Sequence, residues 1–168
     1  MKLISLIVLF IMSILAQIFF LESWQVVGVT ANIVLAFLVV TCLFIPLEQI
    51  LWFGLIGGLM FDFYNNADFG FNMGFYILVI IVAKYLLMFG ENEYSWWKPA
   101  LFASLAALVQ AMLLRFSSIF LNFSWGVVWQ VLAYGILTGL AAIVWYLVIG
   151  QVVELTDKIN FRGIIRSK

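Results

Sequence analysis

Apolar residues occur along this 168-residue chain in long blocks, which short polar or charged segments separate. The blocks are apolar on every side, whereas the strands of a membrane barrel alternate apolar and polar residues. A helix needs about 20 mainly apolar residues to cross a bilayer. The pattern therefore predicts an all-α, polytopic membrane protein, a compact bundle of six transmembrane helices in one domain, 1–150. The expected helices cover residues 3–21, 30–45, 47–62, 71–89, 98–121 and 127–150.

Two features of this pattern leave an alternative open. The second and third helices, separated by Pro46, have about 16 residues each, or roughly 24 Å, which is less than the ~30 Å hydrocarbon core. A five-helix arrangement would merge them.

The first block follows a lone Lys2, as the apolar core of a signal peptide would. Because it is longer than the usual core of about 7–15 residues, and more apolar blocks follow, we expect an uncleaved helix.

The basic residues favour six helices over five. With six, Lys2, Lys98 and the C-terminal basic residues fall on one side of the membrane, whereas five helices would separate Lys2 from the C-terminus. The positive-inside rule therefore predicts that both termini are cytoplasmic. Segment 151–168 is then a cytoplasmic basic tail, which either lies on anionic lipid or frays without a further role. Its basic residues are Lys158, Arg162, Arg166 and Lys168.

The loops on the opposite side are expected to be acidic. They would carry Glu22, Asp62 and Asp68. Tryptophans near the expected helix ends are typical of an interfacial belt. These are Trp24, Trp96, Trp97, Trp125 and Trp129.

Composition supports a lipid environment and excludes several function classes. The chain is 67% hydrophobic and 10% charged, whereas a soluble domain is about half apolar and a quarter charged. The net charge is zero, and the absence of a basic stripe disfavours nucleic acid as a partner. With no histidine and a single cysteine, Cys42, the sequence offers no zinc, haem or Cys-His site. It also contains no other catalytic motif, which predicts a non-enzymatic protein without a cofactor.

Ionisable and polar residues inside membrane helices are hypotheses for function, because they are costly in hydrocarbon. Lys84 lies near a helix end, where it could extend to the interface. Arg115 could extend outward in the same way, or it could pair with Asp62 or Asp68. Gln17 and Gln110 are expected to be buried, where they would form hydrogen bonds between helices or, less often, contact a ligand.

Glycines spaced four residues apart predict close helix packing. Gly54 and Gly58 lie on one helix face, and Asp62 is the next position on that face. Small residues at this spacing let helices approach closely in lipid. The same spacing occurs in two further pairs, Gly70 with Gly74 and Gly135 with Gly139.

The stretch "GLIGGLMFDFYNNADFGFNMGFYILVIIVAKYL", residues 54–86, resembles the core of the MreD family of bacterial rod shape-determining membrane proteins. That family has a glycine-rich helix that ends in an aspartate, a polar turn and a glycine step before the next helix. Gly54, Gly58, Asp62 and Gly70 match this pattern, and "ILAQIFF" around Gln17 resembles the family's first helix. The chain departs from the family pattern at Asn32, where no proline opens the second helix, and in the "PLEQ" turn.

The resemblance implies a non-enzymatic subunit of the cell-elongation machinery in the bacterial inner membrane. Such a subunit would dock a membrane-anchored MreC-type protein and link MreB filaments to a peptidoglycan polymerase–transpeptidase pair. Asp62 would then either terminate its helix or present a carboxylate beside a docking groove.

Two alternatives to this function remain. The substrate-binding subunits of energy-coupling-factor vitamin transporters are also six-helix bundles, and the MreD family is thought to share their fold. Their first helix carries an alanine face for the coupling partner, where the first helix here has bulky residues. A small scaffolding membrane protein without these partners is the other alternative.

Overall fold

The computed structural model describes residues 2–19, 28–65, 69–88, 97–115 and 124–166, and all of their side chains except those of residues 2, 64, 65, 87, 88 and 156–166. Within these ranges the chain forms six α-helices and no strand. The helices are α1 (Lys2–Phe19), α2 (Ile33–Thr41), α3 (Leu47–Asn65), α4 (Phe71–Met88), α5 (Trp97–Leu114) and α7 (Trp125–Arg166).

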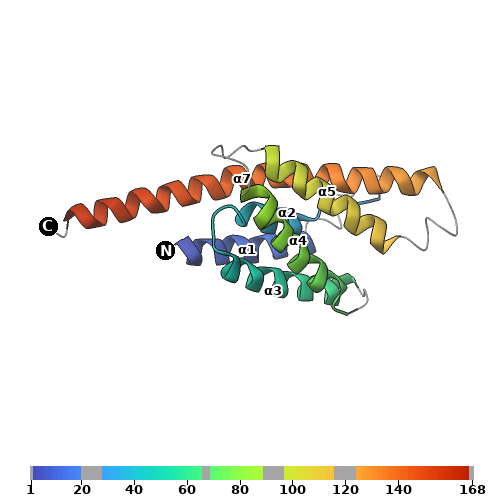
Figure 1. Ribbon diagram of the computed structural model, residues 1–168, viewed down its shortest axis with the longest axis horizontal. Coiled ribbons are helices and arrows are strands. Elements are labelled where there is room, and N and C mark those ends of the chain that lie inside the picture. The colour runs from blue at the N-terminus through green and yellow to red at the C-terminus, as the bar shows by residue number, and fades with distance from the viewer. Residues whose placement is uncertain (1, 20–27, 66–68, 89–96, 116–123, 167–168) are drawn as a thin grey trace.

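The helices form one bundle from which α7 projects. Figure 1 shows the beginning of α1 and the end of α7 toward the same end of the long axis, on the left of the view. α7 has 42 residues and is therefore about 63 Å long. Its C-terminal part extends beyond all of the other helices (Figure 1).

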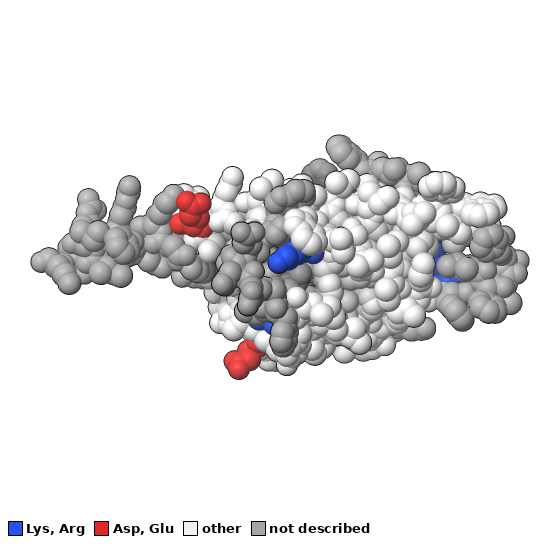
Figure 2. Space-filling model, turned by 45° about the horizontal axis from the view of Figure 1, so that its top comes forward, with Lys and Arg blue, Asp and Glu red and all other residues white. Residues whose placement is uncertain are grey.

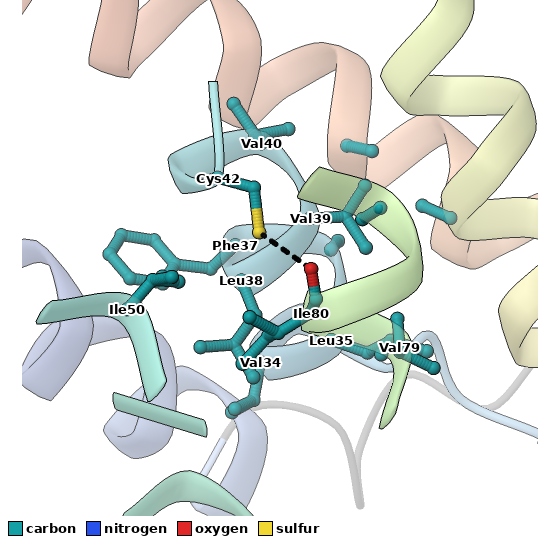
Figure 3. Close-up of a cluster of buried hydrophobic side chains, with 14 of the residues drawn as sticks. Val34, Leu35, Phe37, Leu38, Val39, Val40, Cys42, Ile50, Val79 and Ile80 are labelled. Atoms are coloured by element: carbon teal, nitrogen blue, oxygen red, sulfur yellow. Dashed lines mark hydrogen bonds between the residues drawn. The ribbon is translucent and has the colours of Figure 1, made fainter. Parts of the chain in front are cut away.

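The short helix α2 occupies the centre of the bundle. Every other helix contacts it, and all side chains from Val34 to Thr41 are buried. A helix that is apolar all round needs a neighbour on every side, which explains why α2 contains nothing but apolar residues before Thr41. Figure 3 shows its side chains meeting Ile50 of α3 and Ile80 of α4.

The predicted helix over 30–45 is too long. α2 covers only Ile33–Thr41, about 14 Å at 1.5 Å per residue, so α2 alone does not span a ~30 Å core. The residues before it, 28–32, are not helical, and Gly28 has a φ of 75°. At both ends of α2, side chains from other helices bind the backbone groups that lack an intrahelical partner.

Three other predicted boundaries differ from the observed ones. α3 continues three residues past Asp62, so this aspartate lies inside the helix rather than at its end. α5 ends at Leu114, before the predicted residue 121, and residues 116–123 lie outside the described ranges. α7 does not stop at residue 150, because its backbone continues as a helix through the predicted tail to Arg166. The tail is thus continuous with the last helix.

Within the ranges that the structure describes, two helices are long and apolar enough to cross a membrane, judged by length and composition. They cover Trp97–Leu114 and Trp125–Leu155. The apolar stretches Leu3–Phe19 and Phe71–Leu86 are shorter.

The bundle has an apolar exterior, and a small set of polar side chains is buried within its mainly apolar core. Large apolar side chains such as Trp52, Leu105 and Ile136 are 67%, 52% and 62% exposed. Polar side chains such as Asn32, Asn72 and Gln110 are fully buried. The charges drawn in Figure 2 gather in two places along the long axis, with an uncharged zone between them. In a water-soluble protein, exposed apolar patches are small.

Candidate functional site

The start of α2 lies inside the bundle, and side chains from other helices satisfy its backbone. The first N–H groups of a helix have no intrahelical partner. Here the Asn32 N–H donates to Thr138 Oγ1 at 3.0 Å, and the Ile33 N–H donates to Gln17 Oε1 at 2.7 Å. The Leu35 N–H donates to the side-chain oxygen of the N-cap residue Asn32 at 2.9 Å. Three helices, α1, α2 and α7, are joined at this point.

Asn32 is also the hub of a polar network that crosses the bundle. Its side-chain amide nitrogen lies within hydrogen-bonding distance of three acceptors, Tyr76 Oη at 2.8 Å, Gln110 Oε1 at 3.0 Å and Tyr134 Oη at 3.1 Å, which share its two hydrogens. Gln110 in turn donates to Asn72 Oδ1 at 2.7 Å. The network therefore connects α2 with α4, α5 and α7.

Asp62 ends this network and caps α4 from the neighbouring helix α3. Its Oδ1 accepts from the backbone and the side chain of Asn72, both at 2.8 Å. Its Oδ2 accepts from the N–H groups of Gly70 and Met73 at 3.0 and 3.3 Å. Gly70 has a φ of 93°, which glycine adopts without strain. A carboxylate near these N–H groups is also favoured by the dipole of α4.

Arg115 does not pair with Asp62, contrary to one of the two possibilities raised by the sequence. The Asp62 carboxylate is directed at the N-terminus of α4. Arg115 donates through Nη1 to Gln130 Oε1, which joins the end of α5 to α7. The other expected partner, Asp68, lies outside the described residues.

Lys84 binds the C-terminal end of α2 rather than merely extending to the interface. Its Nζ donates to the carbonyl oxygens of Cys42 and Ile45, each at 2.8 Å. These carbonyls belong to the turn between α2 and Pro46, where intrahelical donors run out. A cation at this position also interacts favourably with the helix dipole. Both ends of α2 are therefore held by side chains from other helices.

Glycines mark two close helix contacts. A Cβ atom on Gly58 would lie 2.7 Å from the backbone nitrogen of Met73, and one on Gly54 would collide with Ile80 Cδ1. These two glycines let α3 approach α4. On α7, a Cβ on Gly135 would lie 2.6 Å from Leu108 of α5, and one on Gly139 would collide with Ser104 Oγ.

The pair Gly70 and Gly74 has a different role from the one predicted. No atom lies within 4 Å of a Cβ built on either residue. Gly70 serves the turn before α4 through its positive φ, and Gly74 is exposed. The sequence did not single out Gly57. A Cβ atom built on Gly57 would lie 3.0 Å from Val34 Cγ1 and 3.2 Å from Phe10 Cζ.

An apolar groove runs between α1 and α3 on the outside of the bundle. Its volume is about 600 Å³. Its floor contains the buried rings of Phe10 and Phe53, whose centroids are 4.9 Å apart. The ring centroid of Phe37 lies 5.6 Å from that of Phe10 and 5.2 Å from that of Trp145. The floor of the groove therefore rests on aromatic rings of the core. Among the described side chains that line the groove, only Gln49 carries an amide or a charged group.

The buried polar network and the apolar groove differ in their chemistry. Among the side chains that the structure describes, every buried polar atom has a hydrogen-bond partner, so the network acts as internal scaffolding. The same part of the chain contains no group of three or more His, Cys, Asp or Glu that could hold a metal. The groove is the surface on which an external apolar molecule could bind.

Several expected residues cannot be placed. The side chains of Lys158, Arg162 and Arg166 are not described, although their backbone is helical, and Lys168 lies outside the described ranges, as do Trp24 and Trp96. Among the described tryptophans, Trp125 and Trp129 are exposed at the beginning of α7.

Sequence reasoning missed half of the polar network. Gln17, Gln110 and Asp62 were singled out, but the tyrosines, Thr138 and Asn72 were not. Tyrosine is common in apolar cores and at interfaces, so it gives little signal alone. Asn72 carries a clearer signal, because an amide two residues after a turn glycine can occupy the first turn of a helix.

Comparison of the chain with protein-family models, with curated proteins and with solved structures finds no match in any of the three.

Proposed function

We propose that the chain is a non-enzymatic integral membrane subunit of the MreD type, a six-helix bundle whose two ends lie in the cytoplasm. In this proposal it belongs to the cell-elongation machinery of a bacterial inner membrane. It docks a membrane-anchored MreC-type protein and couples MreB filaments to the polymerase–transpeptidase pair.

The apolar exterior supports the membrane part of this proposal. A bundle with exposed Trp, Leu and Ile side chains and buried Asn, Gln and Asp side chains is stable in lipid, where polar groups must be satisfied internally. α2 is too short to span alone. Non-helical backbone such as 28–32 is tolerated at membrane depth when protein surrounds it.

The residues that carry the family resemblance support the fold part of the proposal. Gly54 and Gly58 allow close approach of α3 to α4, and Asp62 holds the turn glycine Gly70 and the first turn of α4. The motif thus forms one structural unit, a locked helical hairpin.

The observation that carries the docking function is the length of α7. It begins at Trp125 within the bundle and remains helical to Arg166, past the ends of the other helices. A stiff arm joined to a membrane bundle is suited to transmit position between a membrane partner and a cytoplasmic one. The arm lies toward the same end as the beginning of α1.

The experiment is depletion of the protein in its bacterial host. We expect rod-shaped cells to become round, and the full chain to restore the rod. A chain truncated after Leu155 should enter the membrane but fail to restore shape. The matched control is Gly74→Ala, which adds a methyl group in open space and should restore shape fully. Rods that persist without the protein would contradict the proposal.

The vitamin-transporter alternative makes a different prediction. A substrate-binding subunit should show a rise in melting temperature with its vitamin, by mass action. The hydrogen bonds of Asn32, Gln110 and Tyr134 are made to one another, which favours scaffolding over solute binding. A vitamin that raises the melting temperature would favour the transporter instead.

A further inference from the structure

The groove between α1 and α3 remains unexplained by the docking function and by the polar network. It follows α1 from Leu3 to Ile18 and α3 from Gln49 to Met60. Sixteen residues of helix correspond to about 24 Å, which exceeds the ~15 Å depth of one leaflet's hydrocarbon. Its volume of about 600 Å³ lies within the range of about 300–1,000 Å³ typical of small-ligand sites.

The walls of the groove are unsuited to close packing of another helix. Close helix association in lipid uses small residues, yet the described residues that line this groove include no Gly, Ala or Ser. The small residues of α3 all face inward, Gly54 and Gly58 against α4 and Gly57 against Val34 and Phe10. The walls are bulky instead, with Ile7, Ile11, Trp52 and Ile56 each between 40% and 67% exposed. A flexible chain can follow such an irregular surface.

The polar end of the groove matches the position of a lipid headgroup. Gln49 lies in the first turn of α3, beside the exposed Glu48, and Leu3 lies at the start of α1. The side-chain amide of Gln49 offers two donors, which suit the ester and phosphate oxygens of a phospholipid. Trp52, one turn further along, is a side chain typical of the membrane interface.

We propose that this groove holds one acyl chain of a phospholipid, with its headgroup at the Gln49 end. This inference rests on the membrane location that is part of the proposed function. An empty groove would forfeit dispersion contacts along its aromatic floor, and the lipid supplies them. The walls of the groove contact the acyl chain of the lipid rather than its headgroup. Phosphatidylethanolamine and phosphatidylglycerol, which differ in their headgroups, should therefore bind with similar affinity.

The test uses the full chain purified in mild detergent and native mass spectrometry. We expect one phospholipid to remain bound to the wild type. Ile56→Trp should fill the groove and raise the Kd for the lipid about tenfold, equivalent to about 1.4 kcal/mol. The control is Leu105→Trp on α5, a residue of similar exposure away from the groove, which should retain the lipid. Protection of the buried Cys42 thiol from maleimide verifies that each variant is folded.

A second measurement separates the possible outcomes. After delipidation, either phospholipid should raise the melting temperature of the wild type and of Leu105→Trp, but not of Ile56→Trp. A wild type that loses all lipid, or equal retention in Ile56→Trp, would overturn the inference while leaving the proposed function intact. A photoreactive residue at position 56 that cross-links a protein in the membrane, rather than lipid, would also overturn it. Release of the chain from membranes by alkaline carbonate would refute the membrane location itself.

Discussion

At the scale of single residues, polar side chains inside this protein replace backbone partners that the helices lack. Gln17, Asn32 and Thr138 bind N–H groups at the start of α2, and Lys84 binds carbonyl groups at its end. Asp62 does the same for α4. These side chains therefore bind backbone groups at the ends of neighbouring helices, where groups without an intrahelical partner would otherwise be buried unsatisfied.

Removal of the Asp62 carboxylate tests this interpretation. Asp62→Ala would leave the N–H groups of Gly70, Asn72 and Met73 without their acceptor. We expect a loss of about 3 kcal/mol, because hydrogen bonds to a charged group contribute about 1.5–3 kcal/mol each and a helix cap about 0.5–2 kcal/mol. Thermal unfolding in detergent measures this loss.

Double-mutant cycles then identify the partner of Asp62. The effects of Asp62→Ala and Arg115→Ala should add within about 0.5 kcal/mol, because their side chains share no hydrogen bond. The effects of Asp62→Ala and Asn72→Ala should not add. Strong coupling to Arg115 would show that the carboxylate has been assigned to the wrong partner.

At the scale of helices, the glycine spacing alone does not distinguish a packing site from an open one. Gly58→Ala places a methyl group against the backbone of Met73, which cannot move as a flexible side chain can. We expect it to lower the melting temperature by several degrees, since overpacking typically costs about 1–3 kcal/mol. Gly74→Ala, in the same type of sequence motif, should be neutral or slightly stabilising. Equal effects of the two changes would contradict the observed α3–α4 contact.

The end of α2 provides a second prediction at this scale. Lys84→Met removes both hydrogen bonds to the turn after α2 and should loosen the residues around Cys42. The Cys42 thiol is buried and points toward the Ile80 carbonyl at 3.9 Å (Figure 3). We therefore expect maleimide to modify Cys42 faster in the variant. Lys98→Met, at the start of α5, serves as the control and should leave the thiol protected.

Hydropathy predicted most of these helices but not their ends. The apolar blocks give the number of helices and their order, because long apolar runs have few other solutions. The length of α2 was overestimated because residues 28–32 contain no charge or proline that would interrupt the apolar block. The hydrogen bonds of Gln17 and Thr138 at the start of α2 come from segments distant in the sequence. Likewise, Lys84 and Asp62 were recognised as unusual, but their partners depend on tertiary contacts that spacing does not encode.

At the scale of the whole molecule, the bundle combines an apolar exterior with a polar network buried in a mainly apolar core. The outside of the bundle is apolar and its centre is crossed by hydrogen bonds. In lipid this arrangement satisfies every described buried polar side chain internally. The direction of the helices in Figure 1 then predicts that the start of α1 and the α7 arm emerge on one side, and the α3–α4 turn on the other.

Single-cysteine labelling in intact cells tests this arrangement most directly. In a Cys42→Ser background, a cysteine is introduced by Lys2→Cys, Phe69→Cys or Glu154→Cys, and a membrane-impermeant maleimide is added from outside. We predict labelling of Phe69→Cys alone, with the other two variants labelled only after the membrane is permeabilised. Labelling of Lys2→Cys and Glu154→Cys from opposite sides, or recovery of all three variants in the soluble fraction, would contradict the account.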